Sequence, residues 1–309
     1  MSAWRSARTA AHDVLARPAL WPIALAGFLA RGGILLFIAP VVIPPSLVGL
    51  ATFIGPASIT PTGPTAGLVL RIGLGTVLLA AAVLLGTIAA ALAEVALIAA
   101  ADGAPGRIAP GVVRRVVLIR LVTLLPAALA LVLGIQRLGQ IVYLELTLPT
   151  DLVTPLPIRV AAQAPGIVAA IVLAWLAGET WGGLATRLAV LRGAGVRRAL
   201  LGGLGLFGRR LVNSLALLVV SVVVAIAVLG PAIGLIGWSW DLVRDNLLDA
   251  SAIASVPAVI GATILFASCW LVGLVMAGAL AAWRGVAWTL VVGEDHRGSG
   301  EASPERATL

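Results

Sequence analysis

The chain alternates long apolar stretches with short segments that carry most of its charges. A helix needs about 20 apolar residues to cross a hydrocarbon core of roughly 30 Å. Inside a bilayer every backbone polar group must be bonded within the protein, which favours helices, and the alternating pattern of barrel strands is absent. The pattern predicts an all-α polytopic membrane helical bundle with six transmembrane helices, over Leu20–Ile43, Gly67–Ala101, Val116–Leu138, Ala161–Ala185, Leu211–Ile236 and Ile253–Ala282.

The composition agrees with a membrane protein. Of 309 residues, 61% are hydrophobic and 11% are charged, and the mean hydropathy is +1.10. Soluble domains have about 25% charged residues, and a soluble core of this size could not bury so much apolar surface. We expect a single transmembrane domain over residues 1–288. Residues 289–309 are polar and rich in Gly and Ser, which predicts a disordered cytoplasmic tail.

The arginines are distributed unevenly between the two sides of the predicted helices. With the N-terminus in the cytoplasm, 16 of the 21 basic residues fall in cytoplasmic segments and only three in outer segments. This positive-inside pattern predicts a protein of the cell (inner) membrane with cytoplasmic N- and C-termini. The net charge of +8 is then explained by contact with anionic lipids at the cytoplasmic face, and it does not indicate a nucleic-acid partner.

Three cytoplasmic segments place arginines at helical spacing beside apolar residues and run directly into a span: WRSARTAAHDVLARPALW, GRIAPGVVRRVVLIRLV and RGAGVRRALLGGLGLFGRRLVN. This pattern is typical of interfacial amphipathic helices. The residues that it predicts to contact lipid headgroups are Arg114, Arg115, Arg197, Arg198, Arg209 and Arg210.

The even-numbered spans also resemble one another. WLAGETWGGLATRL aligns without gaps to WLVGLVMAGALAAW, and each basic segment precedes a pair of spans. This similarity favours three hairpin repeats, over residues 1–101, 102–190 and 191–288. Chance similarity between sequences drawn from a small apolar alphabet is the alternative.

Four ionisable residues are candidates for embedded charges, namely Arg31, Arg71, Glu94 and Glu179, and a charge at the bilayer centre costs roughly 2.5–3.5 kcal/mol. Arg71 and Glu94 are 23 residues apart, which is about 35 Å along a helix, so both can lie at opposite membrane interfaces. Arg31 and Glu179 lie deeper and at similar depth. We expect Arg31 to pair with Glu179, alone or together with Glu94. Such a pair either fixes helix register or forms a polar site for an anion or a proton path.

Glycines flank both deep charges. Gly32 and Gly33 follow Arg31 and permit either a helix break or a close helix contact. Gly178 and Gly182 surround Glu179 and form a GxxxG-type contact face.

The sequence contains few residues that could carry catalysis. Its two histidines, His12 and His296, lie in polar segments, and its single cysteine, Cys269, lies in an apolar run. A metal centre needs a larger set of ligands. The chain has neither a phosphate-binding G-x-x-x-x-G-K-[ST] loop nor a G-x-S-x-G nucleophile elbow. We therefore expect no metal, no cofactor and no enzymatic activity.

The stretch GETWGGLATRLAVLRGAGVRRALLGGLGLFGRRL, residues 178–211, resembles bacterial six-span families grouped around the glycerophosphodiester phosphodiesterase membrane domain. In those families an even-numbered helix carries an acidic residue, and a basic interfacial helix leads into the next span. The chain has no counterpart of the phosphodiesterase barrel, so the resemblance implies no catalytic residue. It implies a non-enzymatic accessory, lipid-associated or partner-binding membrane module. A small transporter or permease component with a polar site at Arg31 and Glu179 is the alternative.

Overall fold

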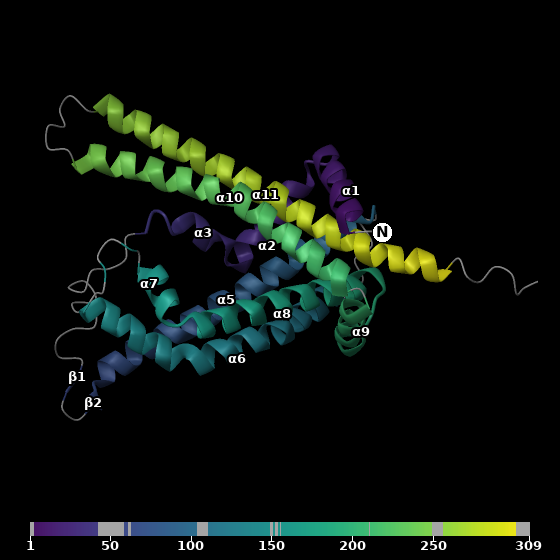
Figure 1. Ribbon diagram of the computed structural model, residues 1–309, viewed down its shortest axis with the longest axis horizontal. Coiled ribbons are helices and arrows are strands. Elements are labelled where there is room, and N and C mark those ends of the chain that lie inside the picture. The colour runs from purple at the N-terminus through teal and green to yellow at the C-terminus, as the bar shows by residue number, and fades with distance from the viewer. Residues whose placement is uncertain are drawn as a thin grey trace, which may run out of the picture. The chain divides into compact units, whose positions relative to one another are not determined.

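The computed structural model describes residues 3–42, 59–60, 63–103, 111–148, 151, 154, 156–209, 211–248 and 256–300. These residues are almost entirely α-helical (Figure 1), and the exception is a short antiparallel ladder of β1 (Ile59–Thr60) with β2 (Gly63–Pro64). Six helical segments in the described part are long and apolar enough to cross a membrane, at the six predicted places. The predicted fold class is confirmed, and the chain is a multi-pass membrane protein.

Several spans extend beyond the predicted limits. The first span is divided into three consecutive pieces, and four others are helices of at least 36 residues. In chain order the helices are α1 (Ala3–Ala16), α2 (Leu20–Phe28), the π-helix η1 (Leu29–Gly33), α3 (Ile34–Ile38), α5 (Ala66–Ala101), α6 (Val112–Thr147), α7 (Leu156–Gln163), α8 (Pro165–Leu191), α9 (Val196–Arg209), α10 (Leu211–Leu248) and α11 (Val256–Gly300).

The helices form two compact units. The first unit contains Met1–Val42, Gly86–Arg120 and Trp181–Leu309, and the second contains Ile43–Leu85 and Leu121–Thr180. The three hairpin repeats and the single-domain boundaries stay predictions. The expected disordered tail begins too early at residue 289, because α11 remains helical to Gly300. Val292 is still buried, which explains why the helix continues.

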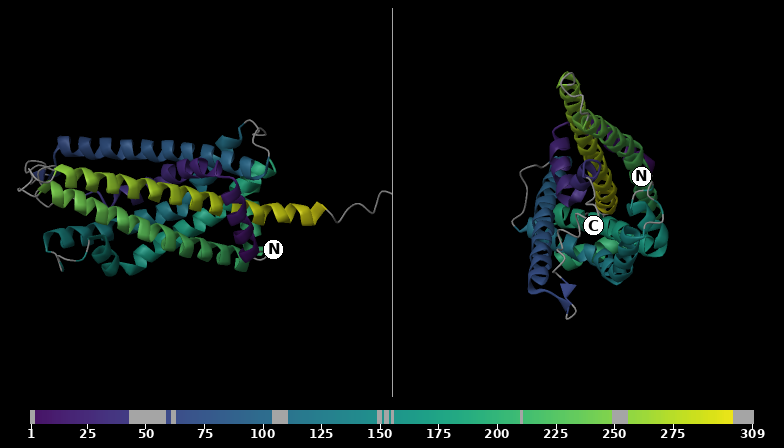
Figure 2. Two further views of the ribbon diagram at one scale, coloured as in Figure 1. Left: turned by 90° about the horizontal axis from the view of Figure 1, so that it is seen from above. Right: turned by 90° about the vertical axis from the view of Figure 1, so that its left-hand side faces the viewer.

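In the first unit, α10 and α11 run side by side, and α2 packs against α11 (Figure 1). Helix α1 crosses α11 at a steep angle (Figure 2). Its buried residues Ala7, Ala10 and Val14 recur at helical spacing, so a single face of α1 meets the bundle. Trp283 fixes this crossing because its indole Nε1 donates to the carbonyl oxygen of Ala7 at 2.8 Å.

In the second unit, glycines allow α6 and α8 to approach closely. A Cβ added at Gly178 would collide with the carbonyl oxygen of Thr123, and one at Gly134 would come within 2.5 Å of Ile167 Cγ2. The predicted contact role of Gly178 is therefore confirmed. Many of the outward side chains in this unit are exposed Leu, Val and Ile, as expected for helices whose solvent is lipid.

Candidate functional site

The most distinctive polar feature of the first unit is the buried carboxylate of Glu94 on α5. Its residue is only 5% exposed, and its neighbours along α5 are Val95, Ala90 and Ala91, all buried. A carboxylate in such surroundings is stable only when it is paired and hydrogen-bonded. Four side chains from other helical segments provide these partners, namely Arg31, Arg120, Thr186 and Arg187. We call these five residues the Glu94 cluster.

Arg120 of α6 makes the most extensive contact with Glu94. Its Nη2 lies 2.6 Å from Oε1 and 2.8 Å from Oε2, and its Nε lies 3.0 Å from Oε2. The planar guanidinium therefore engages both carboxylate oxygens, a geometry that lysine cannot reproduce. Arg120 is itself buried, at 7% exposure. This contact joins the beginning of α6 to the last third of α5.

Arg31 reaches Glu94 from the interrupted first span. Its Nη2 donates to Glu94 Oε2 at 2.8 Å. Arg31 belongs to η1, where Gly32 adopts a left-handed conformation with φ of 95°. A side chain is strained at such a φ, so this position requires glycine. Of the two alternatives for Gly32 and Gly33, a helix break or a close contact, the structure shows a break at Gly32.

Small residues bring the first span close enough to α5 for this ion pair. A Cβ added at Gly86 of α5 would come within 2.6 Å of the carbonyl oxygen of Ala30. At a second point, an ideal Cβ at Gly27 would lie 3.1 Å from Ala93 Cβ. The backbones of the two helices thus approach closely at two points near the Arg31–Glu94 contact, as small residues commonly permit in membrane helices.

Helix α8 completes the cluster with two adjacent residues. The Thr186 hydroxyl donates to Glu94 Oε1 at 2.9 Å, and Arg187 Nη1 lies 3.9 Å from the same oxygen. Arg187 is buried and donates to three neutral acceptors: the carbonyl oxygens of Gly183 and Gly285, at 2.6 and 2.8 Å, and Thr289 Oγ1, at 3.2 Å. Arg187 therefore links α8 to α11 as well as to the carboxylate.

The predictions for the embedded charges were correct in part. The pairing of Arg31 with Glu94 is confirmed. The buried Arg120 and Arg187 also surround the Glu94 carboxylate, and its placement at a membrane interface stays a prediction. Glu179 is half-buried on α8 and belongs to the second unit. Its pairing with Arg31 stays a prediction.

Sequence reasoning missed Arg120 and Arg187, which it counted among the cytoplasmic arginines. Both are buried in the first unit. One signal was present for Arg120, because it lies inside the apolar stretch predicted to span from Val116 to Leu138. Arg187 follows its predicted span by two residues and is brought inside by the continuation of α8 to Leu191.

The second unit has a separate polar cluster. Glu145 of α6 is 2% exposed and accepts hydrogen bonds from Arg159 Nη1, at 2.5 Å, and from the side-chain amide of Gln163. Both donors lie on α7. Glu145 and Arg159 both lie outside the predicted spans, and the structure buries this carboxylate against α7. The cluster holds α7 to the end of α6.

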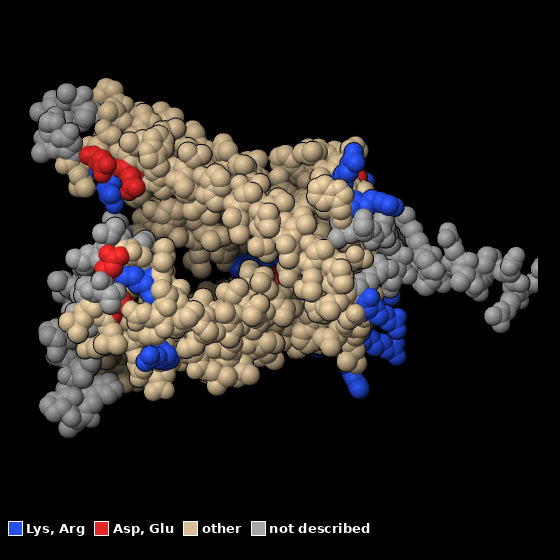
Figure 3. Space-filling view, in the orientation of Figure 1, with Lys and Arg blue, Asp and Glu red and all other residues tan. Residues whose placement is uncertain are grey.

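The predicted lipid-contact residues are accessible. Arg114, Arg197, Arg198 and Arg209 are exposed, and Arg115 is half-buried; Arg210 lies outside the described residues. Figure 3 shows basic side chains gathered at the end of the first unit that holds α1 and α9, next to the uncharged surface of α10 and α11. The far end of α10 carries Asp241 and Asp245 beside Arg244.

Chemically, the Glu94 cluster is a network in which each described member has a charged or neutral hydrogen-bond partner. Within the described ranges, the structure contains no group of three or more His, Cys, Asp or Glu residues that could hold a metal ion. No protein-family model matches this chain, and no curated protein or solved structure matches it either.

Proposed function

We propose that this protein is a non-enzymatic accessory membrane module that associates with anionic lipids at the cytoplasmic face of the cell membrane. The observation that carries the proposal is the closed bonding of the Glu94 cluster. Its carboxylate accepts from Arg31, Arg120 and Thr186, and Arg187 donates to backbone carbonyls. Buried side chains such as Arg120, Thr186 and Arg187, which bond within the protein, join helices and are not exposed to a substrate.

The basic end of the first unit supports the lipid part of the proposal. Exposed Arg197 and Arg198 lie on α9 together with exposed Leu201 and Leu204, while Ala199 and Gly203 are buried. A helix with one packed face and one face that combines arginine and leucine suits a membrane surface with anionic headgroups. The resemblance of residues 178–211 to six-span accessory families agrees with this function.

Extraction of the protein together with the lipids that surround it tests the proposal. The full chain is extracted into native-lipid nanodiscs, and its lipids are compared by mass spectrometry with those of the bulk membrane. We expect enrichment of anionic lipids that falls in the Arg197→Gln/Arg198→Gln variant. The matched control is Arg244→Gln, at the far end of α10, which should leave the enrichment unchanged. A lipid composition equal to that of the bulk membrane would contradict the proposal.

A small transporter or permease component is the second candidate, and one observation favours it. The first span is interrupted at η1, directly beside Arg31, and interrupted helices with charged groups are common at the substrate sites of transporters. This candidate predicts that Glu179→Gln folds normally and loses anion or proton flux in proteoliposomes. Two results contradict the transport function: a variant that fails to fold, or a parent protein that shows no flux.

A further inference from the structure

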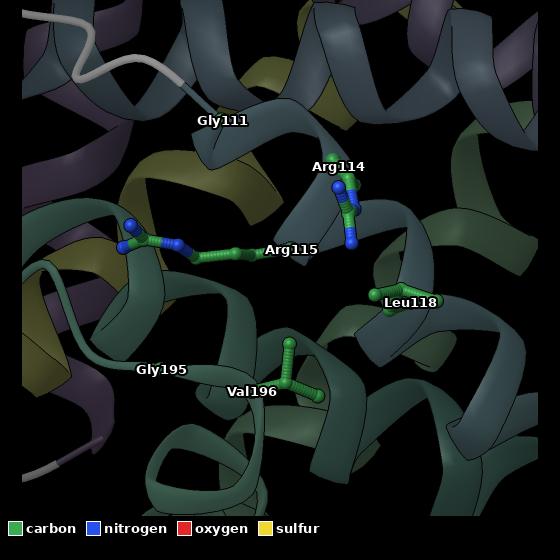
Figure 4. Close-up of a pocket in the computed structure, with 6 residues that line it drawn as sticks. All are labelled: Gly111, Arg114, Arg115, Leu118, Gly195 and Val196. Carbon is green, nitrogen blue, oxygen red and sulfur yellow. The ribbon is translucent and has the colours of Figure 1, made fainter.

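A cleft of about 310 Å³ opens between the beginnings of α6 and α9 in the first unit (Figure 4). It is lined by Gly111, Arg114, Arg115, Leu118, Gly195 and Val196. Two of the six lining residues are arginines and none is acidic. The Glu94 cluster does not use any of them. The cleft is therefore a separate, positively charged feature.

The two arginines of the cleft differ in how they are held. Arg115 extends along one wall, where its Nη1 donates to the carbonyl oxygen of Gly193 at 3.0 Å. Arg114 lies above Leu118 and Val196, and its guanidinium points in a different direction from that of Arg115 (Figure 4). It is exposed, and its side chain makes no hydrogen bond or ion pair to any residue in the described ranges. Arg114 is thus available to bind an anion, and Arg115 is already held in one orientation by its bond to Gly193.

The surroundings of these arginines favour a phosphate group. Gly111 and Gly195 directly precede α6 and α9, and the beginning of a helix favours an anion because its first amides have no intrahelical partners. Arginine guanidinium groups bind phosphate through paired, charge-assisted hydrogen bonds. The cleft thus combines two positively charged side chains with the favourable ends of two helices.

The same cleft also has an apolar side. Leu118 and Val196 line it, and Leu118 belongs to the helix that continues as the span Val112–Glu145. The cleft therefore lies at the start of a membrane-spanning helix, at the place where lipid headgroups meet protein. We propose that it is a specific site for the phosphate group of an anionic lipid headgroup. This inference rests on the proposed lipid association and locates it at Arg114 and Arg115.

Native mass spectrometry of the full chain in detergent tests the site. Dioleoyl phosphatidic acid, phosphatidylglycerol and phosphatidylcholine are titrated separately. We expect the order of affinity to follow phosphate charge, with phosphatidic acid first. Arg114→Gln/Arg115→Gln should lower the affinity for phosphatidic acid by about tenfold or more. Arg114→Gln alone removes an exposed, unbonded side chain, so it should lower this affinity without affecting the fold.

The matched comparison is Arg197→Gln/Arg198→Gln, which removes the same charge from exposed positions of α9 outside the cleft and should lower the affinity less than the cleft variant does. An equal loss in both double variants, or no loss in the cleft variant, overturns the specific site while lipid association survives. A parent protein with no preference for anionic lipid over phosphatidylcholine overturns the proposed lipid association itself.

Millimolar inorganic phosphate should leave bound phosphatidic acid in place. Displacement would assign the cleft to a soluble phosphate and overturn the lipid as its ligand.

Discussion

Arg120 holds both oxygens of the Glu94 carboxylate with a single guanidinium, its Nη2 lying 2.6 Å from Oε1 and 2.8 Å from Oε2. The two residues are 26 positions apart and come from α6 and α5. Because Arg31, Thr186 and Arg187 join the same carboxylate, one side chain connects segments from four of the six spans. This arrangement makes Glu94 the residue whose loss should affect the bundle most.

Glu94→Gln should strongly destabilise the protein. The neutral amide would leave three guanidinium groups beside a partner that no longer carries a negative charge. Breaking a buried ion pair by removing one member typically costs about 3–5 kcal/mol. The free energy of unfolding in mixed detergent and dodecyl sulfate micelles measures this loss. The exposed Arg198→Gln is the control and should change it by less than about 0.5 kcal/mol. A similar, small change in both variants would contradict the structural role of Glu94.

Arg120→Lys should retain the charge and lose the bidentate geometry. We expect a loss of about 1–3 kcal/mol in the free energy of unfolding, because a lysine cannot bond both carboxylate oxygens from one planar group. Arg120→Gln should cost more, since it removes the charge as well. The same unfolding measurement ranks the three proteins. Equal stability of the lysine variant and the parent would show that charge alone matters.

Gly32→Ala should destabilise the first span. Its φ of 95° places an added Cβ in the left-handed region, at a cost of about 1–2 kcal/mol. Gly234→Ala on α10 is the matched control, because its added Cβ meets open space within an ordinary helix. The control should be neutral or gain up to about 1 kcal/mol. Thermal unfolding of both variants distinguishes a required break from a dispensable one.

Arg159→Gln should release α7 from the second unit. The buried Glu145 would lose its ion pair with Arg159 and keep the hydrogen bond from Gln163. We expect amide hydrogen exchange in Leu156–Gln163 to become at least about tenfold faster. Arg137→Gln, an exposed position on α6, provides the control. Unchanged protection of α7 would mean that other contacts hold this helix.

The hydrophobic pattern was sufficient to predict the number and approximate position of the spans, because length and apolarity alone decide whether a helix can cross lipid. It did not predict which carboxylate Arg31 would meet. Spacing gave Glu179 a depth similar to that of Arg31 and placed Glu94 nearer to an interface, and depth was the only quantity available from spacing. The choice depends on helix rotation and on the close contacts of Gly27 and Gly86, which are properties of packing.

The positive-inside pattern had a related weakness. It assigns each arginine to a side of the membrane by sequence position and does not consider where the side chain points. Arg187 was therefore counted as a loop residue, although its guanidinium turns inward to Gly183 and Gly285. Arg197 and Arg198 are exposed, as their predicted contact with lipid headgroups requires.

The ion pair between Arg31 and Glu94 also has a consequence for biosynthesis. The ribosome adds Arg31 63 residues before Glu94, which at about 5–20 residues per second is an interval of roughly 3–13 s. During that interval the first span must enter the bilayer without its counter-charge, at a penalty of roughly 2.5–3.5 kcal/mol for a central arginine. Insertion of the first span is therefore less favourable by this amount until α5 leaves the translocon and brings Glu94 to Arg31.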